Sequence, residues 1–190
     1  MISKDRMYRP FEIRAEGDGK VEGYAVVFES EAVMYEYDGI QYKEVIARDA
    51  FSGAQMDDVV LNFNHSGKPM ARTKNNTLEL KIDSVGLHVT ADLAGTEEGR
   101  KLHEEVKGGY IDKMSFAFTV STEEYNTDTR TRRITGFKRI YDVAAVDFPA
   151  YDSTSIQARS FFEAEAEKER AEARASLELS KLKFNYLGGK

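Results

Sequence analysis

The stretch Met114-Ser115-Phe116-Ala117-Phe118-Thr119-Val120 decides the fold, because it is a short and nearly continuous apolar run. Aromatic and branched side chains at this density are typical of a buried β-strand. The run therefore predicts a strand in the interior of a sheet, with the hydroxyl of Ser115 inside it. A hydroxyl in an apolar strand usually bonds to a backbone carbonyl, so this pattern alone favours a structural role for Ser115 over a role as nucleophile.

Two more strands are expected downstream of this run. Residues 134–140 and 143–148 are rich in apolar side chains, and Pro149 ends the second strand because proline cannot donate to a sheet. Residues 122–133 are polar and are expected to form an excursion from the sheet. The downstream chain thus predicts β structure as far as Pro149.

Upstream of the run the chain also predicts mostly strands, recognised by period-two alternation or by short apolar runs between turn residues. Strands are expected within residues 8–28 on either side of the turn Gly17-Asp18-Gly19, at 57–63, and as a hairpin at 78–82 and 87–93. Residues 29–44 predict a loop with a short strand at its end. Residues 46–51 predict a brief helical turn that ends near Gly53.

One helix is predicted between these strands and the deciding run. Thr96 is a suitable N-cap, and Glu97 and Glu98 follow it where the helix dipole favours negative charge. The helix should run to about Lys107, where Gly108-Gly109 stops it. Many strands with one or two helices predict an α+β or barrel-like domain.

The end of the chain differs in character from this domain. Residues 163–174 (EAEAEKERAEAR) contain no large apolar side chain, so they are expected to contribute nothing to a core. Their alanine, glutamate, lysine and arginine content favours a helix. We therefore expect a folded domain over residues 1–158 and a charged, exposed, helical or partly disordered extension over residues 159–190.

Composition excludes several classes of protein. The chain has 190 residues and a net charge of −6, which argues against a nucleic-acid partner. It has no cysteine, which excludes disulfides, thiolate metal sites and cysteine nucleophiles. No apolar run approaches the length of a membrane span and no signal peptide is recognisable, so we expect no membrane association.

The three histidines are the candidate bases. His88 lies in a strand pattern and His103 on the predicted helix, so both are expected to be structural or solvated. His65 follows a buried strand at the start of a loop, which is a common way to position a general base, although an ordinary loop histidine fits equally well. The three show no metal-ligand spacing, and no metal or other cofactor is expected.

Two carboxylates complete the candidate chemistry. Asp142 and Asp147 interrupt an apolar strand and, being five residues apart, face opposite sides of it. A histidine can take the proton of a serine while an acid holds the imidazole tautomer. The sequence thus offers Ser115, His65 and one of two aspartates.

These segments, in their order along the chain, resemble the caudovirus prohead protease family of tailed-phage maturation proteases. The resemblance covers residues 8–158 and is carried by VEGYAVVF (21–28), NHS (64–66), GLHV (86–89), MSFAF (114–118) and DVAAVDFPA (142–150). The family is similar in fold to herpesvirus assemblins. The resemblance therefore implies a small, mainly antiparallel β-barrel with a few surrounding helices.

The resemblance also implies residue roles. His65 matches the family histidine and Ser115 the family nucleophile. The family usually has a glutamate before a Val-Ser-Leu-Val stretch, and Asp142 is the match here, although it is one methylene shorter; Asp147 is the alternative. Arg72 and the backbone around Gly108-Gly109 are the candidates for oxyanion donors.

By the same resemblance the protein is a serine endopeptidase inside the phage procapsid, in the bacterial host cytoplasm. Its expected partners are the major capsid protein and scaffold as substrates, the chain itself, and further copies in a homo-oligomer. A non-catalytic capsid assembly or scaffold protein that keeps the protease fold is the alternative. A protease fused to a short scaffold segment is a third.

Overall fold

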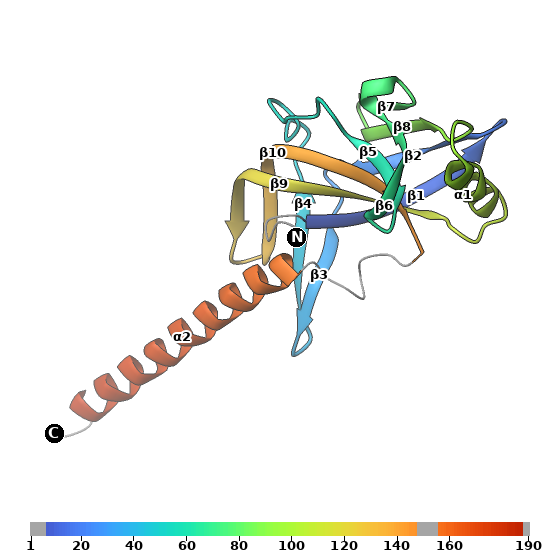
Figure 1. Ribbon diagram of the computed structural model, residues 1–190. Coiled ribbons are helices and arrows are strands. Elements are labelled where there is room, and N and C mark those ends of the chain that lie inside the picture. The colour runs from blue at the N-terminus through green and yellow to red at the C-terminus, as the bar shows by residue number, and fades with distance from the viewer. Residues whose placement is uncertain (1–6, 148–155, 188–190) are drawn as a thin grey trace.

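The computed structural model describes residues 7–147 and 156–187, which form one large β-sheet with a helix at either end (Figure 1). The strands are β1 (Met7–Glu16), β2 (Lys20–Val27), β3 (Ala32–Tyr37), β4 (Ile40–Ile46), β5 (Val60–Phe63), β6 (Ser66–Arg72), β7 (Leu78–Ile82), β8 (Gly86–Asp92), β9 (Lys113–Asn126) and β10 (Thr131–Val146). The helices are α1 (Glu97–Lys107) and α2 (Ile156–Leu187), and a short 3₁₀ turn, η1 (Thr73–Asn75), follows β6.

The strands form a 10-stranded sheet in the order β3-β4-β10-β9-β1-β2-β8-β7, with β5 and β6 branching from β10. Most neighbours are antiparallel, but β10 pairs in parallel with β4 through its first part and with β5 through its last part. The predicted α+β class is confirmed. The predicted barrel is not, because no pairing joins the edge strands β3 and β7 and the described sheet stays open.

The deciding run lies in β9 as expected. Phe116 and Phe118 are fully buried and stack with ring centroids 4.6 Å apart in the main core. Phe137 of β10 packs edge-on against both rings. Ser115 and Ala117 alternate with these rings and face the other side of the sheet. The run thus supplies both the core and a second buried face.

Residues 122–133 do not leave the sheet, so the prediction of an excursion is wrong. They extend β9 and β10 into a long hairpin, and residues 134–146 form one strand with it rather than two. Arg132 is the physical reason: it is buried, and its guanidinium donates to Glu44 at 3.2 Å and to Glu123 at 2.8 Å. A buried charge with two carboxylate partners holds a polar strand in place.

Residues 32–46 form the hairpin β3–β4 where a loop with one short strand was expected. Asp38 and Gly39 make its turn with φ angles of 53° and 74°. An Asp-Gly pair suits such a left-handed two-residue turn. Met34 of β3 and Tyr42 of β4 are buried and belong to a second, smaller core.

The helix α1 begins and ends as predicted. The Thr96 hydroxyl accepts a hydrogen bond from the Gly99 N–H at 2.9 Å, and Glu97 and Glu98 occupy the first turn. Leu102 and Val106 bury one face of the helix in the main core. α1 thereby packs beside β1, β2 and β6 (Figure 1).

The helix α2 is partly docked, which corrects the expectation that residues 163–174 add nothing to a core. Ala166 is buried with Phe162 against Met34 and Tyr42. Alanine suffices here because a small side chain allows close approach of the helix to the sheet. Farther along, α2 projects away from the sheet, as Figure 1 shows.

Candidate active site

His65 is presented by the tight turn between β5 and β6. Phe63 pairs with Ser66 across this turn, and Asn64 and His65 adopt φ angles of 49° and 55°. Such left-handed backbone is uncommon outside glycine and tends to occur at functional sites. Two hydrogen bonds fix the turn to β10, one from the Asn64 N–H to the Ala145 carbonyl at 2.9 Å and one from the Asp147 N–H to Asn64 Oδ1 at 3.3 Å.

The imidazole of His65 contacts the carboxylate of Asp142, with Nδ1 and Oδ1 2.5 Å apart. Both side chains are largely buried, at 14% and 6% exposed. A carboxylate can only accept, so Nδ1 carries the proton and Nε2 is the basic nitrogen of the ring. This is the orientation in which an acid prepares a histidine to act as a base.

Ser115 lies on the same face of the sheet as Asp142. In the β9–β10 register Ser115 is opposite Ala144 and Ala117 is opposite Asp142, and residues two apart on a strand share a face. Ser115 is buried, and its Oγ has no hydrogen-bond partner among the described residues. The backbone bond expected of a structural hydroxyl is therefore not made.

The alternative acid, Asp147, lies one residue beyond the end of β10 and is exposed. Its backbone N–H bonds to Asn64, but the carboxylate beside the His65 ring is that of Asp142. Ser115 and Asp142 thus share one face of β9 and β10, and His65 contacts Asp142, but no hydrogen bond joins the Ser115 hydroxyl to His65 among the described residues.

The expected oxyanion donors are engaged elsewhere. Arg72 donates from Nε and Nη2 to the two oxygens of Asp58, both at 2.6 Å. The Gly108 and Gly109 N–H groups donate to the α1 carbonyls of Glu104 and Val106, at 2.8 and 3.0 Å. The glycine amides close the end of the helix and are not available to an oxyanion in this structure.

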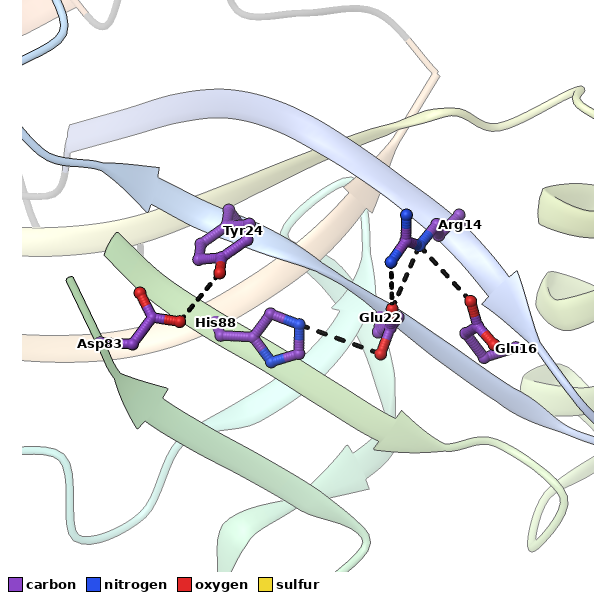
Figure 2. Close-up of polar contacts among 6 residues, drawn as sticks. All are labelled: Arg14, Glu16, Glu22, Tyr24, Asp83 and His88. Carbon is purple, nitrogen blue, oxygen red and sulfur yellow. Dashed lines mark hydrogen bonds and ion pairs between the residues drawn. The ribbon is translucent and has the colours of Figure 1, made fainter. Parts of the chain in front are cut away.

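His88 belongs to a separate polar cluster on β1, β2, β8 and the turn between β7 and β8, drawn in Figure 2. Its Nε2 is 3.9 Å from Glu22, which also accepts from Arg14, and its ring packs edge-on against Tyr24. The Tyr24 hydroxyl donates to Asp83 at 2.8 Å, and this bond raises the pKa of the tyrosine. These are cross-strand contacts of a sheet surface, as expected for a structural histidine.

His103 is buried on α1 beside Leu102 and Val106, as a structural histidine would be. No group of three histidine, aspartate or glutamate side chains among the described residues could hold a metal ion. Within the same residues, no helix is long and apolar enough to cross a membrane.

Asn62 is a candidate that the sequence did not single out. It pairs with Ala144 from the side opposite Ser115, so Asn62, Ala144 and Ser115 form a row across three adjacent strands. Its side chain is buried, and Oδ1 has no hydrogen-bond partner within the described part of the chain. A polar residue in the otherwise apolar end of the strand, VVLNF (59–63), was the available signal.

Known proteins are similar to this chain in sequence and in fold. The family model of the caudovirus prohead serine protease matches residues 9–169. The prohead protease of Enterobacteria phage HK97 is 28% identical over 164 residues, which cover 83% of this chain and 68% of that protein. The solved structure of the bacteriophage T4 capsid assembly protease is similar in fold, with a TM-score of 0.50 at 13% identity, over 76% of this chain and 98% of that one.

Proposed function

Since the chain belongs to the caudovirus prohead serine protease family, a family of capsid maturation proteases, we propose that it is itself an active serine endopeptidase. Its catalytic residues in this proposal are Ser115, His65 and Asp142. The observation that carries the proposal is the contact of 2.5 Å between His65 and Asp142, since Asp142 shares its sheet face with the buried Ser115 hydroxyl, which makes no competing hydrogen bond within the described chain.

The chemistry follows from these positions. Ser115 Oγ attacks the carbonyl carbon of the scissile peptide, and its proton passes to Nε2 of His65. Asp142 keeps the ring in the required tautomer through Nδ1 and stabilises the imidazolium that forms. The imidazolium then protonates the leaving amine, and water repeats the sequence on the acyl-enzyme to release the carboxylic acid and restore Ser115.

The burial of the site supports this mechanism. Ser115 and Asp142 are nearly inaccessible, and electrostatic interactions are stronger in such a water-poor setting. Asn62 extends the same face beyond β10 with an amide that can bond to the backbone of an extended substrate. We assign it to substrate positioning.

We further propose that the substrates are the major capsid protein, scaffold and the chain itself, inside the procapsid in the bacterial host. The name of the HK97 relative, prohead protease, supports a capsid substrate. The projecting part of α2 supports self-cleavage, because it lies away from the body of the domain and its residues are exposed.

Co-expression with the major capsid protein of the same phage tests the proposed function. The wild-type chain should shorten the capsid protein, and the Ser115→Ala variant should leave it intact while keeping the circular dichroism spectrum of the folded domain. Equal cleavage of the capsid protein in the presence of wild type and of Ser115→Ala would contradict the proposal. If the capsid protein were also cleaved when neither form of the chain is expressed, another protease would be responsible, and this chain would be a non-catalytic assembly protein.

A further inference from the structure

The projecting part of α2 carries an unusual concentration of exposed apolar side chains. Among the described residues, eight large hydrophobic side chains are exposed, and four of them lie here: Leu177, Leu179, Leu182 and Tyr186. Their exposed fractions range from 55% to 87%. Exposed apolar side chains in such number mark surfaces that bind a partner, so their arrangement on the helix indicates where a partner would lie.

Three of the four form a stripe with Ala175. The spacings between Ala175, Leu179, Leu182 and Tyr186 are four, three and four residues, which is the spacing of the a and d positions of a heptad repeat. We call these four residues the distal stripe. Leu177 lies outside it, on the far side of the helix.

The distal stripe does not face the body of the protein. The docked face of α2 is marked by Phe162 and Ala166, which pack on Met34 and Tyr42. At 100° per residue, the distal stripe lies roughly 150° round the helix axis from that face. A second helix can therefore lie along the distal stripe without displacing the contacts that hold α2 to the sheet.

We propose that the distal stripes of two copies of this chain pair, in parallel and in register, as a short two-stranded coiled coil. The charges flanking the stripe identify the occupant as a second copy. Glu178 and Lys183 are exposed and stand five residues apart, at the g position and the following e position. In a parallel pair, Glu178 of each copy faces Lys183 of the other, which gives two symmetric ion pairs.

The antiparallel arrangement is disfavoured by the same residues. There a g position faces a g position and an e position faces an e position, so Glu178 would no longer meet Lys183 of the other copy and both ion pairs would be lost. The stripe is only about two heptads long, so the association should be weak, reversible and dependent on concentration. It does not depend on proteolysis, so its failure would leave the proposed function untouched.

Cysteine cross-linking tests orientation and register together. The chain has no cysteine, so a single introduced thiol reports only its own environment. In a Ser115→Ala background, Ala175→Cys and Tyr186→Cys should each give a disulfide-linked dimer under mild oxidation, several-fold more than the control Leu177→Cys. If only one of the two cysteine variants formed the disulfide-linked dimer, or if neither formed more of it than Leu177→Cys, the parallel in-register pair would be overturned.

Sedimentation equilibrium tests whether the stripe drives the association. Leu182→Gln should raise the dimer dissociation constant at least tenfold, while Leu177→Gln, a similarly exposed leucine off the stripe, should leave it unchanged. Glu178→Lys and Lys183→Glu should each weaken self-association, and mixing the two variants should restore it. A wild-type chain that stays monomeric at millimolar concentration, or equal effects of the two leucine variants, would overturn the proposal.

Discussion

His65 Nδ1 lies 2.5 Å from Asp142 Oδ1, although 77 positions separate the two residues in the chain. One residue stands in a tight turn with left-handed backbone and the other near the end of the long strand β10. The parallel pairing of β5 with β10 brings the two elements together. This contact orients the His65 ring, and the choice between the two candidate acids depends on it.

The first prediction separates the two candidate acids. Asp142→Asn should reduce kcat/KM by about 10⁴-fold, because an amide at this position no longer selects the tautomer with the Nδ1 proton. Asp147→Asn, the same change at an exposed carboxylate, should keep near wild-type activity. Peptide-cleavage kinetics on both variants measures the difference, and the reverse order of activities would move the third catalytic role to Asp147.

The second prediction concerns Asn62. Asn62→Leu removes a buried acceptor that has no partner among the described residues, so stability should stay equal or rise by about 1 kcal/mol. Because the amide is assigned to substrate positioning, kcat/KM should fall about tenfold, mainly through KM. Denaturant titration and steady-state kinetics measure the two effects.

Thr119→Val is the matched control for Asn62→Leu. Its Oγ1 is also buried without a partner in the described chain, but it lies four residues along β9 from Ser115, about 13 Å away. The control should gain stability similarly and retain its activity. Loss of activity in both variants, or in neither, would contradict a specific role for Asn62.

The third prediction concerns the docking of α2. Phe162→Ala should destabilise the protein by about 3–5 kcal/mol, because the fully buried ring packs on Tyr42 and its removal leaves a cavity. Leu177→Ala on the projecting part should change stability by less than about 0.5 kcal/mol. Chemical denaturation of both variants checks this, and similar costs would mean that α2 is not held at Phe162.

The fourth prediction concerns acid stability. The two hydrogen bonds from Arg72 lower the pKa of Asp58 to about 2, below its ordinary value of about 3.9. A carboxylate whose pKa is depressed in the folded state stabilises the fold above its unfolded pKa and loses that contribution as the pH falls toward the folded value. Asp58→Asn should therefore be less stable than wild type at neutral pH.

The difference between Asp58→Asn and wild type should shrink as the pH falls from about 4 to about 2. Asp57→Asn, at the neighbouring exposed carboxylate, controls for the change in net charge. Thermal unfolding across this range is the measurement. A stability difference that stays constant down to pH 2 would contradict the assigned ion pair.

Much of the fold could be predicted from local patterns, because strands and caps are local. The alternation of β1 and β2 about Gly17-Asp18-Gly19 and the capping of α1 by Thr96 needed no tertiary information. The hairpin β9–β10 could not be predicted as easily, since Arg132 is polar and its burial depends on Glu44 from a distant strand. The docking of Ala166 was missed because its partners, Met34 and Tyr42, lie on distant strands and a methyl group gives no sequence signal of a core contact.

The candidate site shows the same division. Ser115 and His65 could be identified by their flanking segments, whereas the choice between Asp142 and Asp147 needed the register of β10 and the path of the turn at His65. Asn62 was missed because a single amide near the end of an apolar strand is unremarkable until the pairing with Ala144 places it in a row with Ser115. The oxyanion expectation at Gly108-Gly109 failed because helix closure uses those amides.

The most direct test of the central claim is the reaction of the full chain with a fluorophosphonate, followed by mass mapping of the labelled peptide. The account predicts stoichiometric labelling at Ser115, abolished by Ser115→Ala and slowed at least a hundredfold by His65→Ala. Labelling at another serine, or an unreactive chain that nonetheless cleaves its capsid protein, would contradict the assignment of Ser115 as the nucleophile.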